Sequence, residues 1–182
     1  MKFVPTRIPD VIRIEPEVFG DGRGFFLETW HARKFAAAGI DAAFVQDNFS
    51  RSCRGTLRGL HLQLRRPQGK LVHVTYGEIF DIAVDLRRGS PSYGRWVGET
   101  LSTENKFQLW IPPGFAHGFY VTSESADMLY KCTDFYAPEH ERSLAWNDSR
   151  LNIAWPLVDG ATPLLSHKDA AGLSLDQLER EL

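Results

Sequence analysis

The sequence predicts an all-β protein, either a sandwich or a barrel, with a few short helices at its periphery. Short runs rich in Val, Ile, Thr, Phe and Tyr recur through the 182 residues, and turn-forming residues separate them, since the chain holds 15 Gly and 10 Pro. Strands at such spacing are typical of sandwiches and barrels. No linker, repeat or low-complexity tract divides the chain, so we expect one domain over residues 1–182.

The expected strands follow one another through most of the chain. In the first of them, Ile12 and Ile14 alternate with Arg13 and Glu15, which is the period of two that a half-buried strand shows. The runs that we expect to form strands lie at residues 10–19, 24–30, 43–50, 55–63, 70–77, 78–87, 96–102, 106–112, 118–123 and 127–136.

Two short helices are expected, at residues 31–39 and 174–182. The first contains three alanines and ends at a glycine, a residue that commonly follows a helix. The second begins with serine and glutamine in capping-box spacing. The stretch 137–173 is less regular, but it holds Trp146 and Trp155. Side chains of that size usually pack, so this stretch should wrap over the sheet.

The composition excludes several classes of protein. The net charge is −2, which gives no general attraction to nucleic acid or to an anionic membrane. No run approaches the ~18–20 apolar residues of a membrane span, and prolines break the N-terminus where a signal peptide would need an apolar run. Cys53 and Cys132 fit no metal-ligand spacing. We therefore expect two free thiols in a protein of the cytoplasm.

Arg58 and His61 stand three residues apart in the strand expected at 55–63. In a regular strand they would point to opposite faces. Gly59 lies between them, and a glycine inside a strand often marks a bulge or a bend. A bulge would bring both side chains to one site. Without it, Arg58 is a solvated arginine and His61 is a core histidine.

The stretch from Pro112 to His117 reads P-x-G-x-x-H, which resembles the second motif of cupin jelly rolls. In metal-binding cupins that histidine is a ligand, and a His-x-His motif followed by a glutamate supplies the others. This sequence has no His-x-His, and His61, His73 and Glu78 do not have the required spacing. A closed metal site is therefore not expected.

Positive charge beside the expected turns could converge on a phosphorylated ligand. Lysine point charges and guanidinium forks suit a diphosphate, and carboxylate or amide side chains could hold a nucleoside or a sugar. The candidates are Arg23, Arg58, Lys70 and Lys168 for the phosphates, and Glu28, Gln46, Asn48 and Glu141 for the remainder. Tyr130 becomes a candidate acid only if it shares a cavity with His61.

Six motifs occur in a fixed order along the chain. They are DxRGFFxE at 21–28, FVQDNxS at 44–50, GTLRGLHxQ at 55–63, QGKLVxVxxGEIFDxAVDLRxxSPxYG at 68–94, PPGFAHGF at 112–119 and LSxKD at 165–169. Together they resemble the dTDP-4-dehydrorhamnose 3,5-epimerases. The resemblance implies a cupin-type jelly-roll sandwich, a homodimer, and no metal or other cofactor. It also implies the substrate, dTDP-4-dehydro-6-deoxy-D-glucose, and the product, dTDP-4-dehydro-L-rhamnose.

The resemblance further implies the catalytic roles. His61 would be the base, and Asp169 would pair with its imidazole. Lys70 would lie at the keto oxygen, and Tyr130 occupies the position of the general acid. The nucleotide sugar would be held by Arg23, Glu28, Gln46, Asn48, Arg58, His117, Glu141 and Lys168.

The same family implies a site shared between two chains, because the segment around Arg23 crosses to the partner subunit. The thymine could stack on an aromatic side chain, and Phe26 and Tyr136 are both candidates.

These residue types suit the chemistry. The protons at C3 and C5 are both adjacent to the C4 ketone, so removing either gives an enolate. A poised base contributes about 10²–10⁴-fold, and an unperturbed histidine titrates near neutral pH. A cationic donor is needed for the developing oxyanion, and a second group must return the proton to the opposite face. The ketone is already present, so no redox cofactor is needed, and the chain has no G-x-G-x-x-G stretch.

Four other functions remain open at this point. A 5-epimerase would invert one carbon only, and a ketoisomerase on the same scaffold would move the carbonyl group. A non-catalytic cupin would bind the nucleotide sugar without exchanging its protons. A metal-dependent cupin dioxygenase would require a bound metal.

Overall fold

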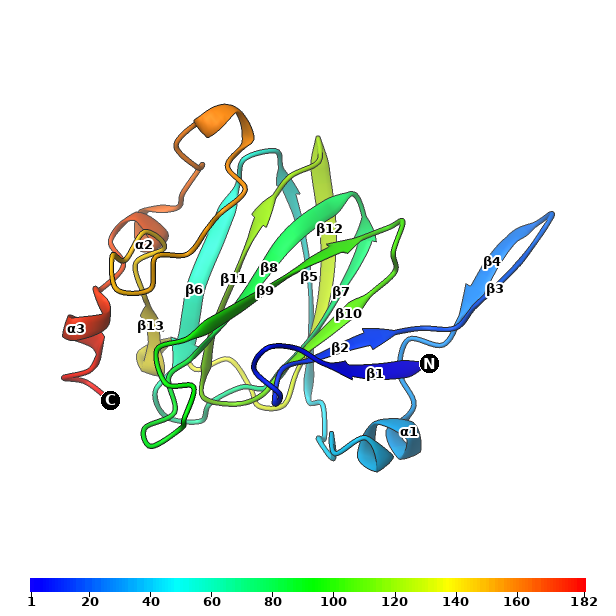
Figure 1. Cartoon of the computed structure of the whole chain (residues 1–182), viewed down its shortest axis with the longest axis horizontal. Helices are drawn as coiled ribbons and strands as arrows, with labels where there is room; N and C mark the ends of the chain where they lie inside the picture. The colour runs from blue at the N-terminus through cyan, green and yellow to red at the C-terminus, as the bar shows by residue number, and fades with distance from the viewer.

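The computed structural model describes the backbone of residues 1–182 and every side chain except that of Asp159. Two antiparallel sheets face each other, and a two-stranded hairpin stands apart from them (Figure 1). This arrangement, with only short helices, confirms the all-β prediction. No helix in the part of the chain that the structure describes is long and apolar enough to span a membrane.

The six-stranded sheet has the order β1-β2-β10-β7-β12-β5, and the five-stranded sheet has the order β13-β6-β11-β8-β9. The bounds in the first sheet are Lys2–Pro5 for β1, Ile12–Glu15 for β2, Gln108–Ile111 for β10, Lys70–Tyr76 for β7, Ser125–Cys132 for β12 and Gln46–Cys53 for β5. Those in the second are Glu141–Ser143 for β13, Leu57–Gln63 for β6, Phe115–Val121 for β11, Glu78–Asp85 for β8 and Trp96–Ser102 for β9. The hairpin consists of β3 (Val18–Asp21) and β4 (Gly24–Leu27).

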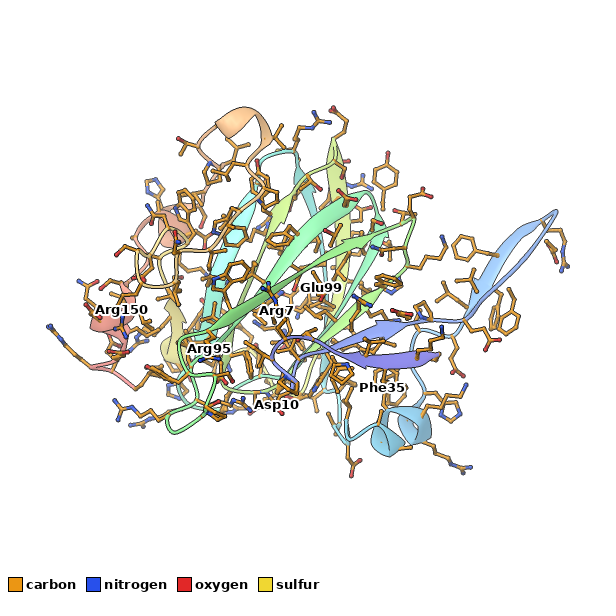
Figure 2. All side chains as sticks on the ribbon, in the orientation of Figure 1. Arg7, Asp10, Phe35, Arg95, Glu99 and Arg150 are labelled. Atoms are coloured by element: carbon orange, nitrogen blue, oxygen red, sulfur yellow. The ribbon has the colours of Figure 1, made fainter. Side chains whose placement is uncertain are left out.

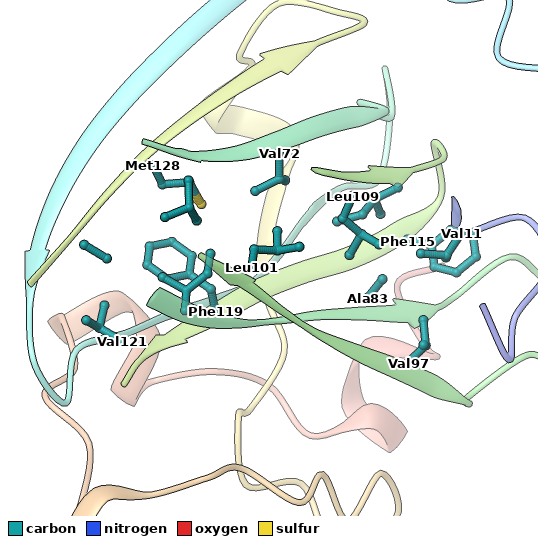
Figure 3. Close-up of a cluster of buried hydrophobic side chains, with 14 of the residues drawn as sticks. Val11, Val72, Ala83, Val97, Leu101, Leu109, Phe115, Phe119, Val121 and Met128 are labelled. Carbon is teal, nitrogen blue, oxygen red and sulfur yellow. The ribbon is translucent and has the colours of Figure 1, made fainter. Parts of the chain in front are cut away.

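The main core fills the space between the two sheets. Alternate residues of facing strands point inward, among them Val72 of β7, Ala83 of β8 and Phe119 of β11 (Figure 3). Burying such side chains contributes about 25 cal/mol per Å² of apolar surface. This packing fixes the positions of the facing strands relative to each other.

Two further apolar clusters cover the outer faces of the sandwich. On the five-stranded sheet, Leu144, Leu151 and Trp155 from the tail pack against the sheet, which confirms that residues 137–173 wrap over it. On the six-stranded sheet, Phe35 of α1 packs beside Trp110. The helix lies at the edge of the body (Figure 2).

Both expected helices are present, although each is shorter than expected. They are α1 (Ala32–Ala37) and α3 (Leu175–Leu178), and the capping box between Ser174 and Gln177 is formed. A third helix, α2 (His167–Ala170), was not expected. Two 3-10 turns, Pro138–His140 and Val158–Gly160, were also missed, as were the edge strands β1 and β13.

The strand β6 contains the irregularity that the sequence suggested at Gly59. His61 pairs with His117 of β11, whereas Arg58 pairs with Phe119, so three steps along β6 match two along β11. The extra residue is a bulge. It changes the parity of the strand, and Arg58 and His61 line one pocket.

We predict that Gly59→Ala destabilises the fold by about 2–4 kcal/mol. Gly59 has a φ of 121°, and a Cβ atom there would lie 2.5 Å from the Cα of Gly118. Gly89→Ala is the matched control, because Gly89 has a φ of 83° but open space where its Cβ would be. Denaturant unfolding of both variants measures the difference, and equal losses would contradict a role for close contact at Gly59.

Candidate active site

A pocket of about 540 Å³ opens between the two sheets. Strands β5, β7 and β12 of one sheet and β6, β11 and β13 of the other contribute to its wall. Its floor meets the main core at Phe119 and Met128. The polar residues that line it are Gln46, Asn48, Ser50, Arg58, His61, Gln68, Lys70, His117, Tyr130, Tyr136, Glu141, Ser166, Lys168 and Asp169.

The pocket brings together all of the candidate catalytic and nucleotide-sugar-binding residues except Arg23, Phe26 and Glu28. Arg23 and Phe26 line a separate hollow on the β3–β4 hairpin. Glu28 forms an ion pair with Lys34 of α1. Within one chain, therefore, these three residues do not reach the pocket.

His61 is held by a carboxylate behind it. Its Nε2 lies 2.5 Å from Oδ1 of Asp169, whose side chain is 4% exposed. With Nε2–H donating to Asp169, the other ring nitrogen, Nδ1, is the one left to accept a proton. The arrangement is that of an imidazole base with an orienting carboxylate.

The short helix α2 explains how Asp169 comes to lie behind β6. Ser166 caps this helix by accepting from the backbone N–H of Asp169, and its hydroxyl donates to Oδ2 of Asp169 at 2.7 Å. Burial alone would raise the pKa of Asp169, but the hydrogen bonds with His61 and Ser166 outweigh it and lower that pKa. Asp169 is thus a carboxylate near neutral pH.

Lys70 and Tyr130 come from the other sheet, at β7 and β12. Burial lowers the pKa of Lys70. Burial is also the main cause of the raised pKa of Tyr130, and the negative charge of Glu141 adds to it. Tyr130 therefore keeps its proton near neutral pH. The pocket has a base on one wall and a phenol and an amine on the other.

The mouth of the pocket carries a polar cluster. Glu141 accepts hydrogen bonds from Tyr136 at 2.9 Å and from Lys168 at 2.8 Å. On β6, the guanidinium of the exposed Arg58 donates to Ser52 at 2.9 Å. Cationic and amide groups at this entrance suit an anionic, hydrogen-bonding ligand.

The hairpin that carries Arg23 and Phe26 is exposed. The side chain of Arg23 is 91% exposed, and its ion pair is with Asp21 of the same hairpin. Phe19 and Phe25 are also exposed. Figure 1 shows the hairpin projecting from the body of the molecule, and Nζ of Lys106 lies 4.8 Å from the ring centre of Phe25.

Sequence reasoning missed several residues of the site. Ser50 follows Gln46 and Asn48 at the period of two along β5, so alternation could have identified it. Its buried hydroxyl has no hydrogen-bond partner among the described residues. Gln68 and Ser166 belong to motifs that were noted for other residues.

No cluster of three or more His, Cys, Asp or Glu side chains that could hold a metal occurs among the described residues. His61 and His117 each bond a carboxylate, at Asp169 and Asp81. His73, the other histidine considered in the sequence, is not among the pocket residues.

We predict that Ser166→Ala costs about 1 kcal/mol of stability and lowers kcat about tenfold. Asp169 would lose the hydrogen bond from Ser166, so its pKa would rise. A lowered pKa in the folded state stabilises the fold at pH above the unfolded pKa, and this contribution is lost as the pH falls through the folded pKa. Acid unfolding of the variant should therefore begin at a higher pH.

Ser174→Ala is the matched control for this variant, because Ser174 caps α3 in the same way. It should lose similar stability with unchanged kcat. A thermal melt, an acid titration and steady-state rates measure these effects, and equal kcat losses in both variants would contradict the link to Asp169.

The chain is similar in sequence and fold to proteins of one known family. The family model for dTDP-4-dehydrorhamnose 3,5-epimerase matches residues 5–177. A protein of that name from Pseudomonas aeruginosa is 64% identical over 173 residues, which cover 94% of each chain. A Legionella pneumophila dTDP-6-deoxy-D-glucose-3,5-epimerase, solved in complex with dTDP-4-keto-L-rhamnose, is 54% identical, with a TM-score of 0.95 over 99% of this chain and 95% of that chain. The Elizabethkingia anophelis epimerase structure is 47% identical, with a TM-score of 0.91 over 97% of each chain.

Proposed function

Because the chain belongs to the dTDP-4-dehydrorhamnose 3,5-epimerase family, we propose that its pocket converts dTDP-4-dehydro-6-deoxy-D-glucose to dTDP-4-dehydro-L-rhamnose. The chain is thus an isomerase that inverts C3 and C5 of a keto sugar. The observation that carries this proposal is the opposition of His61, on one sheet, to Lys70 and Tyr130, on the other.

In the proposed reaction, His61 removes the proton from a carbon next to the C4 ketone. Asp169 accepts from Nε2–H and stabilises the imidazolium that forms. The electrons move to the C4 oxygen, where the ammonium of Lys70 stabilises the enolate. Tyr130 then donates its proton from the opposite side of the ring, and that carbon is inverted. The same enolate oxygen serves C3 and C5, so one lysine supports both steps.

The entrance cluster supports a nucleoside diphosphate as the recognition group. Arg58 and Lys168 would contact the phosphates, while Gln46, Asn48 and Glu141 would hold the nucleoside or the sugar. Binding energy from this unreacting part would fix the ring between the base and the acid. Tyr136 at the mouth is one candidate to stack on the thymine.

The proposal includes a homodimer in which each hairpin completes the partner's pocket. Arg23, Phe26 and Glu28 lie outside the pocket of their own chain, and aromatic side chains of the hairpin are exposed. Phe26 is the second candidate to stack on the thymine. We also keep the cytoplasm as the proposed location, on the ground that Cys53 and Cys132 are free thiols.

Isotope exchange tests the function. In D₂O, the product sugar should carry deuterium at both C3 and C5, read by proton NMR. Label at one carbon only would indicate a mono-epimerase, and a shifted carbonyl signal in ¹³C NMR would indicate a ketoisomerase. Tight dTDP binding without any exchange would indicate a binding protein and overturn the proposal.

Mixing two inactive chains tests the shared site. We predict that co-expressing His61→Asn with the double variant Arg23→Ala/Phe26→Ala restores activity in up to about a quarter of the pockets, because half of a random set of dimers is mixed and one pocket in each is intact. The matched control pairs His61→Asn with Lys70→Met, which damages every pocket. Activity no higher than in the control would contradict the exchange of hairpins.

A further inference from the structure

A buried ion pair lies beside the pocket, and the mechanism above does not use it. Nε2 of His117 lies 3.0 and 2.9 Å from the two carboxylate oxygens of Asp81. Asp81 is 0% exposed and sits on β8 among core side chains such as Ala83. Burying a carboxylate there costs free energy unless it is paired. The cost of burying Asp81 suggests that its carboxylate has a role in the site.

The charge state of the pair follows from its surroundings. Burial lowers the pKa of His117, and this outweighs the opposite effect of Asp81. The ring is therefore neutral near pH 7, with Nε2–H donating to Asp81. A neutral imidazole gives the Asp81 carboxylate a hydrogen bond but no counter-charge at this edge of the pocket.

A negative charge near Lys70 would favour the protonated form of its amine. The charged or titratable groups that face it are Tyr130 and Cys132 of β12, Asp81 of β8, His117 of β11, Arg58 and His61 of β6, Tyr136, Glu141 of β13, and Lys168 and Asp169 of α2. Burial favours a neutral amine at Lys70. A neutral amine would stabilise the enolate oxygen far less than an ammonium group does.

Cys132 and Glu141 add little free negative charge near Lys70. Cys132 is the residue opposite Lys70 across β12 and β7, but burial raises the pKa of its thiol, which stays uncharged near pH 7. Glu141 is ionised but forms an ion pair with Lys168 at 2.8 Å. Asp169 and Asp81 each bond a histidine ring, but of these two carboxylates Asp81 is the one whose charge raises the pKa of Lys70.

We propose that Asp81 is a positioning residue whose buried charge keeps Lys70 protonated, so that an ammonium group meets the enolate oxygen. The hydrogen bond from His117 holds the Asp81 carboxylate in place. This role rests on the proposed function, since it gives the charge of Lys70 a task in the reaction.

The test is Asp81→Asn, which removes the charge with little change of shape. Lys70 would then lose its proton at a lower pH. The alkaline limb of the kcat/KM profile should move down by at least about one pH unit, and the Lys70 ¹⁵Nζ or ¹³Cε NMR signal, assigned by its loss in Lys70→Met, should titrate lower by the same amount. A folded variant that leaves both unmoved would overturn the proposal.

Asp85→Asn is the matched control. Asp85 is also a fully buried carboxylate of β8, but it bonds Arg87, Ser90 and Ser92. This variant should lose stability while the Lys70 signal and the alkaline limb stay in place. A shift as large as in Asp81→Asn would mean that general damage to β8 moves Lys70, and would overturn the proposal.

Two further variants keep the proposal testable if Asp81→Asn does not fold. Cys132→Ser and Glu141→Gln remove the rival groups, and neither should lower the Lys70 titration by a full unit. Such a shift in either would identify a different counter-charge and overturn the assignment of Asp81. The NMR titration of Lys70 needs no turnover, whereas the D₂O experiment measures the reaction itself. The role of Asp81 and the proposed function can therefore fail independently of each other.

Discussion

The His61→Asn variant is expected to lose epimerisation by about 10²–10⁴-fold and to stop deuterium uptake at both C3 and C5. Both carbons lie next to the same ketone, and His61, with Asp169 behind it, is the base that the pocket offers to them. Asparagine retains a polar side chain but cannot accept the proton. Proton NMR in D₂O measures the loss at each carbon separately.

The matched control for His61→Asn is His73→Asn. His73 is a half-buried histidine of β7 that is not among the residues lining the pocket. This control should keep normal exchange rates, and His61→Asn should keep its affinity for dTDP in calorimetry. Persistent exchange at either carbon in folded His61→Asn would show that another group serves as the base there.

The Lys70→Met variant is expected to lower kcat about 10²–10³-fold, the effect of removing one donor from a developing oxyanion. Methionine keeps the apolar stem of the side chain but lacks the amine. Exchange at C3 and at C5 should fall by similar factors, because both enolates place their charge on the C4 oxygen. Single-turnover rates with the keto sugar measure the rate of the chemical step without a contribution from product release.

Lys131→Met is the matched control for Lys70→Met. Lys131 is a neighbouring lysine on β12 that forms an ion pair with Asp47 and does not line the pocket. Its loss should leave kcat unchanged. If Lys70→Met raised KM and left kcat intact, the lysine would serve to bind the substrate and not to stabilise the enolate.

Much of the fold could be predicted because local patterns and tertiary packing agree along the strands. The capping box at Ser174 and the bulge at Gly59 depend on residues close in sequence, and both were correctly expected. β11 begins at Phe115, earlier than expected, because the turn is completed at Gly114, which has a positive φ of 88°. The edge strand β13 has only three residues, and the sequence of β1, KFVP, does not alternate between apolar and polar residues.

The site was harder to predict in full, because its members meet only in three dimensions. The motifs named the residues of the two walls, but not the pairing of Asp81 with His117 across β8 and β11. A carboxylate within the apolar run of β8 was a signal that could have found it. The sequence also gave no measure of how far the β3–β4 hairpin stands from the pocket of its own chain.

A crystal structure of His61→Asn with the bound keto sugar tests the central claim most directly. The C4 oxygen should lie within hydrogen-bond distance of Nζ of Lys70, with residue 61 and Tyr130 on opposite faces of the sugar ring. A C4 oxygen that points away from Lys70 would contradict the proposed inversion. So would a complex in which residue 61 and Tyr130 lie on the same face of the sugar ring.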